Sequence, residues 1–150
     1  MQGAKGHVDV DVILDVDQAA AWAAVTDWAG QSQWMLGTQV RATVADGVGV
    51  GGGVEAFTGI GPLGVWDTMV ITEWDPPHRA AVVHTGRVIR GTGTFEVFAL
   101  PAGRSRFVWA EDLELPAGRA GQLGWPVVRP LVAAGVRASL ARLARQLADR

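Results

Sequence analysis

The sequence has 150 residues, of which 49% are hydrophobic, and a formal net charge of −2. This length suits one folded domain with a core of its own, so we expect a single domain over residues 1–150. The lack of cysteine excludes disulfides and thiolate chemistry, no apolar run is long enough to span a membrane, and the first residues lack the apolar core of a signal peptide. We therefore expect a cytoplasmic protein.

The start of the chain predicts one strand and two short helices. Residues 7–17 begin with a strict alternation of apolar and acidic side chains, which is typical of a strand with one buried and one solvated face. Asp17 precedes an alanine-rich run and is expected to cap a first short helix, because an aspartate accepts a hydrogen bond from a free backbone N–H at a helix start. Asp27 is expected to cap a second short helix that leads toward Trp34.

The middle of the chain predicts six further strands, which brings the total to about seven. They are expected in residues 38–45, 52–59, 66–74, 79–86, 90–100 and 105–115. Turn signals separate them, such as Asp46–Gly47 and the Asp-Pro-Pro run that begins at Asp75. Their close spacing favours an antiparallel meander.

Side-chain alternation indicates which residues face the core. In the last strand the inner face is expected to carry Phe107, Trp109, Glu111, Leu113 and Leu115. In the strand before it, Phe95 shares a face with Gly91 and Gly93. The parity of the two middle strands is open; we favour Phe57 with Glu55, and Met69 with Ile71 and Asp67, as the inward-facing sets.

The last thirty residues predict one long helix, beginning at about residue 119. Its apolar stripe consists of Val132, Val136, Leu140, Leu143 and Leu147. The steps of three and four residues are those of one helix face, which we expect to be buried against the sheet.

Charge is distributed unevenly along the chain. Residues 1–118 hold 14 acidic and 7 basic residues, whereas residues 119–150 hold 1 acidic and 6 basic residues. We interpret this as a solvated arginine face beside an acidic sheet and expect no nucleic-acid binding, because arginines without interleaved aromatic residues are a weak electrostatic signal. Twelve arginines against one lysine indicate a GC-rich, bacterial genome.

Four segments, taken in order, resemble one known family. They are AAWAAVTDW with the following Trp34, ITEWDPPHR, GRSRFVWAEDLELP with Ser105 where threonine is usual, and SLARLARQLA. Together they resemble the polyketide cyclase/dehydrase-type group of the START/Bet v1-like (SRPBCC) superfamily, and the match covers nearly the whole chain. The resemblance implies an α+β helix-grip fold, in which a strongly curved antiparallel sheet wraps around the long C-terminal helix. It also implies a mostly apolar cavity between them, but no particular reaction.

A cavity of this kind predicts a small hydrophobic ligand, polycyclic or lipid-like ones included, and a set of residues that contact it. Those residues are expected to be Phe57, Met69, Phe95, Trp109, Glu111, Val132, Val136, Ser139 and Leu140. We expect a monomer or homodimer without cofactor. Three dispersed histidines, with His7 in a disordered start and His78 in a turn, make a metal site unexpected.

Glu111 is the most informative polar residue, because an unpaired carboxylate on an apolar strand face is costly to bury. It needs a donor such as an arginine, a tryptophan N–H or a backbone N–H, and Arg87 and Arg129 are the arginines considered. A structural ion pair, a ligand contact and a general acid or base remain open roles. The weak catalytic candidates are Glu111, His84 and Arg87.

Three functions remain open at this point. The first is a small-molecule binding protein. The second is a polyketide cyclase or dehydratase, which would need two or more convergent titratable groups. The third is a co-chaperone-like interaction module, which would need an exposed apolar patch that the sequence does not indicate.

Overall fold

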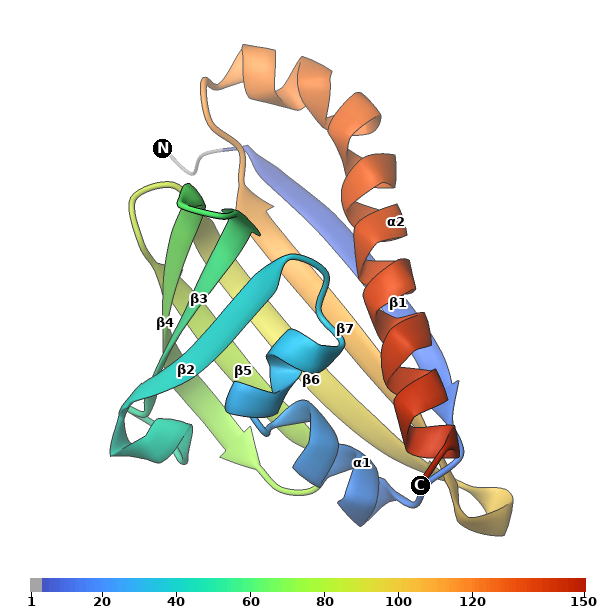
Figure 1. The fold of residues 1–150 in the computed structure, drawn as a ribbon. Helices are drawn as coiled ribbons and strands as arrows, with labels where there is room; N and C mark the ends of the chain where they lie inside the picture. Colours follow the sequence, from blue (N-terminus) through green and yellow to red (C-terminus); the bar gives the residue numbers. More distant parts are fainter. Residues whose placement is uncertain (1–3) are drawn as a thin grey trace.

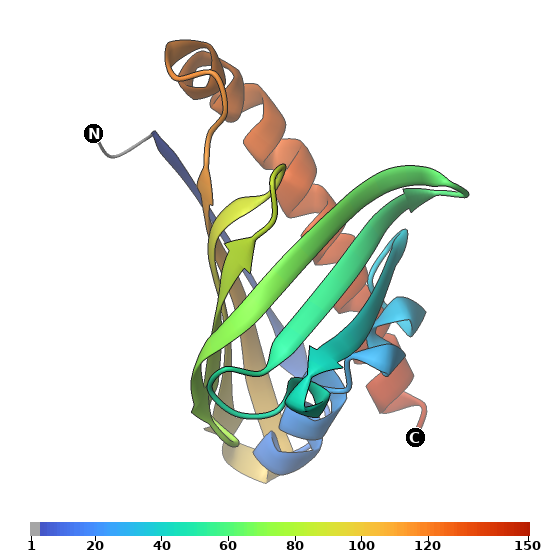
Figure 2. The same cartoon turned by 90° about the vertical axis from the view of Figure 1, so that its left-hand side faces the viewer.

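The computed structural model describes residues 4–150 and contains a seven-stranded antiparallel sheet (Figure 1). The strands are β1 (Lys5–Leu14), β2 (Thr38–Val44), β3 (Gly53–Ile60), β4 (Leu63–Asp75), β5 (Arg79–Thr85), β6 (Arg90–Leu100) and β7 (Arg104–Glu114). Their spatial order is β1-β7-β6-β5-β4-β3-β2, so the first strand pairs with the last and β2 forms the far edge. Figure 2 shows the strong curvature that turns β2, β3 and β4 away from the plane of the other strands. The predicted α+β helix-grip fold is confirmed.

Two short helical segments follow β1, as predicted. These are α1 (Gln18–Val25) and the 3₁₀ helix η1 (Ala29–Gln33); two further 3₁₀ turns, η2 (Ala45–Gly47) and η3 (Pro101–Gly103), connect strands. Asp17 caps α1 as predicted, because its Oδ1 accepts from the Ala20 N–H at 2.8 Å. The N-cap of η1 is Trp28, not Asp27 as predicted, although Asp27 Oδ1 accepts from the Gly30 N–H of the first turn at 3.2 Å.

The long helix α2 (Arg119–Ala148) begins where the sequence predicts and runs back along β1 (Figure 1). Its C-terminal half is docked, with Leu140, Leu143 and Leu147 buried. The amide of Gln146 and the guanidinium of Arg142 both donate to the carbonyl of Gln33, which fixes this half against η1.

The N-terminal half of α2 exposes apolar side chains. Leu123 is 81% exposed and Leu131 is 71% exposed, with Val127 between them on the same stripe. This corrects the expectation that the surface has no apolar patch, because the helix begins beyond the part of the sheet that it covers. Among residues 4–150, no helix is long and apolar enough to cross a membrane.

Two residues at this end lie elsewhere than the sequence suggested. Arg129, considered as a partner of Glu111, has an exposed side chain that donates to the carbonyl of His7 at 2.9 Å. His7 itself lies within β1 and pairs with Asp9 and Asp112, so it is not part of a disordered start.

Candidate ligand-binding site

The concave face of the sheet encloses a cavity of about 140 Å³ that strands β2–β7 share with the segment from Trp28 to Met35. Most of its lining is apolar, with Val54, Ala56, Met69, Phe95 and Trp109 among the residues that contribute. The cavity exists because several inward positions carry small side chains. The small inward residues are Val54, Ala56 and Thr58 on β3 and Gly93 on β6.

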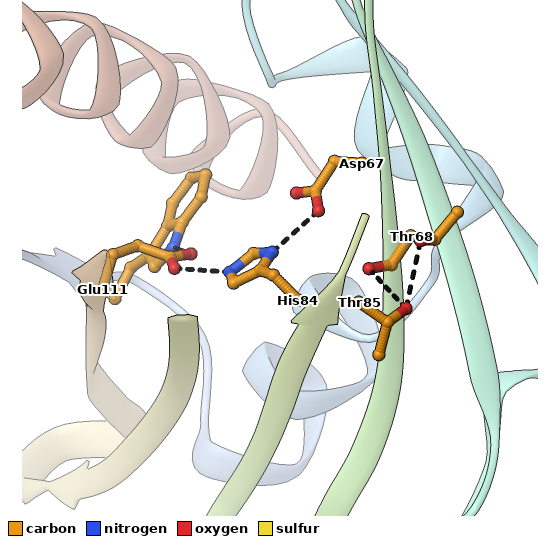
Figure 3. A network of polar contacts seen from close by, with 6 residues as sticks. Asp67, Thr68, His84, Thr85 and Glu111 are labelled. Atoms are coloured by element: carbon orange, nitrogen blue, oxygen red, sulfur yellow. Dashed lines mark hydrogen bonds and ion pairs between the residues drawn. The ribbon is translucent and has the colours of Figure 1, made fainter. Parts of the chain in front are cut away.

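Three titratable side chains from three strands converge in this cavity: Asp67 on β4, His84 on β5 and Glu111 on β7 (Figure 3). His84 Nδ1 lies 2.8 Å from Asp67 Oδ1, and His84 Nε2 lies 2.8 Å from Glu111 Oε2. The Trp109 indole N–H donates to Glu111 Oε1 at 2.8 Å. We call Asp67, His84 and Glu111 the polar cluster.

Strand register explains this convergence. His84 stands opposite Met69 on β4 and opposite Gly91 on β6, so Met69 and His84 share the inward face. Thr68 follows Asp67 and Thr85 follows His84 in the sequence, and the hydroxyl groups of these two threonines lie 3.0 Å apart beside the polar cluster (Figure 3). Because alternate residues of a strand face opposite sides, this second pair is consistent with Asp67 and His84 both pointing into the cavity.

Gly93 makes the hydrogen bond between His84 on β5 and Glu111 on β7 possible. Strand β6 lies between them, and Gly93 on β6 stands opposite Glu111. A Cβ at Gly93 would lie 2.8 Å from both carboxylate oxygens of Glu111, which is too close for real Cβ contacts. The missing side chain therefore leaves the space in which the Glu111 carboxylate reaches His84.

The two carboxylates determine the protonation of His84. The ring is 4% exposed, and burial by itself lowers the pKa of a histidine. The hydrogen bonds and negative charges of Asp67 and Glu111 outweigh that effect and raise the pKa of His84 to about 10. At neutral pH the ring is therefore an imidazolium that donates to both carboxylates.

Glu111 lies in the interior, as its strand parity predicts, but its partners differ in part from those considered. The tryptophan N–H is one of the alternative donors that the sequence predicted for Glu111, whereas Arg87 and Arg129, the arginines considered, are both exposed. His84 takes that place. In the strand register His84 stands opposite Gly91, and Glu111 stands opposite Gly93, two residues further along the same face of β6.

The other residues expected to contact ligand fall into three groups. Met69, Phe95 and Trp109 line the cavity, and Val132, Val136 and Ser139 line an adjoining groove of about 190 Å³ that shares Met35, Thr38 and Trp109 with it. Leu140 is 1% exposed and belongs to the core, lining neither space within residues 4–150. The Ser139 hydroxyl accepts from the Leu36 N–H at 3.0 Å, so it also holds α2 against the chain after η1.

Phe57 is the placement that the structure corrects. The inward residues of β3 are Val54 and Ala56, so Phe57 and Glu55 lie on the opposite face. Phe57 packs on Trp66 with ring centroids 5.1 Å apart, and Glu55 pairs with Arg41. Sequence reasoning also missed Trp28 and Gln31, which reach the cavity from the segment that follows α1.

The sequence matches the family model described as polyketide cyclase / dehydrase and lipid transport over residues 5–148. The chain belongs to this family. No curated protein matches the sequence.

Several solved structures have the same fold as this chain. The chain is 18% identical to the Zhui aromatase/cyclase from Streptomyces sp. R1128, with a TM-score of 0.70 over 96% of this chain and 92% of that one. It is 15% identical to the di-domain ARO/CYC BexL, with a TM-score of 0.72 over 93% of this chain but 45% of the larger protein. A protein from Thermus thermophilus is 18% identical, with a TM-score of 0.77 over 96% of this chain and 98% of that one. These identities support the fold and not a shared substrate.

Proposed function

We propose that this protein binds a small hydrophobic molecule in the cavity and orients it through the polar cluster. The observation that carries the proposal is an apolar cavity that ends on three bonded titratable groups, Asp67, His84 and Glu111. An apolar cavity with a few convergent polar groups is the usual form of a small-molecule site. The family description supports the same class of ligand.

The cavity volume sets the size of the part of the ligand that is fully enclosed. An engineered apolar cavity of about 150 Å³ binds benzene, and this cavity is about 140 Å³. One six-membered ring therefore fits inside. A larger molecule would continue past Trp109 into the groove beside Val132 and Val136.

Titration with N-phenyl-1-naphthylamine, whose emission rises in apolar surroundings, tests the proposal. We expect saturable binding that Ala56→Phe weakens roughly tenfold or more, because the new ring occupies the cavity. Ala134→Phe adds the same ring at an exposed position of α2 and is the matched control. Equal binding by both variants, with circular dichroism showing both folded, would place the probe elsewhere and contradict the proposal.

A second candidate function is acid–base catalysis of the cyclase or dehydratase type. It is favoured by the three convergent titratable groups, a condition that the sequence alone did not meet. A carboxylate of the cluster could take a proton from the carbon between two carbonyl groups, leaving an enolate, and His84 would then redistribute that proton within the cluster. The aromatase/cyclase neighbours are consistent with such chemistry.

Deuterium exchange at the central carbon of 1-phenyl-1,3-butanedione, followed by NMR, tests this second function. We expect the protein to accelerate the exchange above the buffer rate, and Asp67→Asn to abolish the acceleration while N-phenyl-1-naphthylamine still binds. An exchange rate equal to that in buffer would remove the catalytic interpretation and leave the binding proposal intact.

A further inference from the structure

The polar cluster has a net charge of −1 wherever its shared proton lies. With His84 as an imidazolium, one positive charge faces two carboxylates. If the proton moved from His84 to Asp67 or Glu111, a neutral imidazole would face one carboxylate and one carboxylic acid. The sum is unchanged, so the charge does not depend on the assignment of the proton.

Within the described part of the chain, no further cation in the cavity balances this negative charge. None of the residues that line it is lysine or arginine, as far as residues 4–150 are concerned. Both ring nitrogens of His84 are already bonded to carboxylates, so the imidazolium has no donor left for a ligand. A buried charge is costly unless an opposite charge or hydrogen bonds compensate it.

One carboxylate oxygen is open to the cavity. Asp67 Oδ1 accepts from His84, whereas Asp67 Oδ2 bonds to no other residue in the described chain. No side-chain oxygen or nitrogen in that part of the chain is both fully buried and unpaired. Asp67 Oδ2 is therefore accessible from the cavity that Asp67 lines, where it is available as an acceptor.

Aromatic rings form the wall beside the cluster. Trp28, Phe95 and Trp109 all line the cavity, with the Phe95 centroid 6.4 Å from Trp28 and 5.6 Å from Trp109. The faces of such rings attract cations, and aromatic walls are a recurrent feature of sites for organic ammonium groups. The aromatic wall and the uncompensated carboxylate therefore both favour a ligand with a positively charged group.

We infer that the ligand carries a protonated amine, which would bind Asp67 Oδ2 while its apolar body fills the aromatic part of the cavity. This inference rests on the proposed ligand-binding function and names the class of ligand: a hydrophobic organic cation. The same charge disfavours carboxylates and phosphates, because no cationic side chain of residues 4–150 is free in the cavity to pair with them.

A matched series of one-ring compounds tests the inference. Benzylammonium, benzyl alcohol, toluene and benzoate share a ring that fits about 140 Å³ and differ in the polar group. The indole N–H of Trp109 reports binding by NMR, because it bonds to Glu111 inside the cluster. We expect benzylammonium to bind roughly tenfold more tightly than benzyl alcohol, since charge-assisted hydrogen bonds are about twice as strong as neutral ones. Benzoate is expected to bind most weakly.

The outcomes separate this inference from the function on which it rests. If benzyl alcohol or benzoate binds as tightly as benzylammonium, the inference is overturned while binding in the cavity stands. If none of the four compounds shifts the Trp109 signal, both the inference and the proposed function fail.

Two variants test whether the cluster causes the preference. Glu111→Gln and Asp67→Asn each remove one negative charge, and in each we expect the preference for ammonium over alcohol to fall below roughly threefold. Glu73→Gln makes the same change on the same strand as Asp67, at an exposed residue paired with Arg79, and is expected to keep the full preference. An undiminished preference in both cluster variants would overturn the inference, and the wild-type series remains decisive if one of them fails to fold.

Discussion

At the scale of single residues, the burial of His84, more than its pattern of hydrogen bonds, gives this residue its strong electrostatic effect. His7 has the same pattern on the surface, with its ring nitrogens 2.6 Å from Asp9 and 2.8 Å from Asp112. The pKa of His7 is also raised, by its hydrogen bonds to Asp112 and then Asp9. Its side chain is 51% exposed, however, whereas that of His84 is 4% exposed. Water screens the surface group, so only the inner one creates a site with strong electrostatic consequences.

The raised pKa of His84 predicts how stability depends on pH. The folded-state pKa of about 10 lies above the unfolded value of 6.5, so the contribution is complete below pH 6.5 and is lost as the pH rises to about 10. The upper bound on this loss is about 5 kcal/mol. Urea unfolding at intervals over this pH range measures it. The variant His84→Gln should lack most of this dependence and His7→Gln should keep it; the same slope in both would contradict the assignment.

Gly93 provides a second test at the residue scale. The Cβ of Gly93→Ala would displace the Glu111 carboxylate, so we expect the pKa of His84 to fall, as measured by NMR titration of its ring. Gly135→Ala is the matched control, because no atom of the described residues outside its own helix backbone lies within 4 Å of its new Cβ and alanine favours the helix by about 1 kcal/mol. An unchanged His84 titration in Gly93→Ala would show that the carboxylate does not occupy that space.

At the scale of elements, α2 consists of two unlike halves. Its periodic stripe predicted the docked half, because a buried helix face repeats every 3.6 residues whatever it packs against. The apolar residues before Val132 follow a similar spacing, yet Leu123 and Leu131 are exposed. Periodicity shows which face of a helix is apolar, but it does not show where the neighbouring sheet ends.

One matched pair of substitutions distinguishes the two halves. Leu140→Ala should lower the free energy of unfolding by about 2–5 kcal/mol, because it leaves a cavity in a core position that is 1% exposed. Leu123→Ala removes the same atoms from a side chain that is 81% exposed and should change stability by less than about 0.5 kcal/mol. Denaturant unfolding of both measures the difference; equal losses would contradict the docking described for α2.

The middle strands show why part of the site could not be predicted. On β3 the parity was open and Phe57 with Glu55 was favoured as the inward-facing set, whereas Val54 and Ala56 face the cavity. A sheet that encloses a cavity needs small inward residues, and the bulky Phe57 finds a partner outside in Trp66. On β7, the parity of Trp109 and Glu111 was predictable because Arg106, Asp112 and Glu114 mark the opposite face of the strand as polar. The contact with His84 required the register of three strands, which no single segment contains.

At the scale of the whole molecule, the curved sheet brings together residues that are far apart in sequence. Asp67, His84 and Glu111 come from β4, β5 and β7, and the segment after α1 closes the cavity over them. The order of elements and the four family-like segments were enough to predict this architecture from the sequence. His84 and Glu111 were predictable only as separate candidates and Asp67 only as an inward-facing residue, because the chemistry of the polar cluster depends on hydrogen bonds between strands.

The most direct test of the account follows the ring nitrogens of His84 by NMR while benzylammonium is added at neutral pH. We expect both nitrogens to be protonated at the start, and their signals to shift saturably with the same dissociation constant as the Trp109 indole N–H. The ring signals of His7, on the outer surface, should not move. His84 signals that stay unchanged when the protein is saturated with benzylammonium would contradict the assignment of the cavity and its polar cluster as the ligand-binding site.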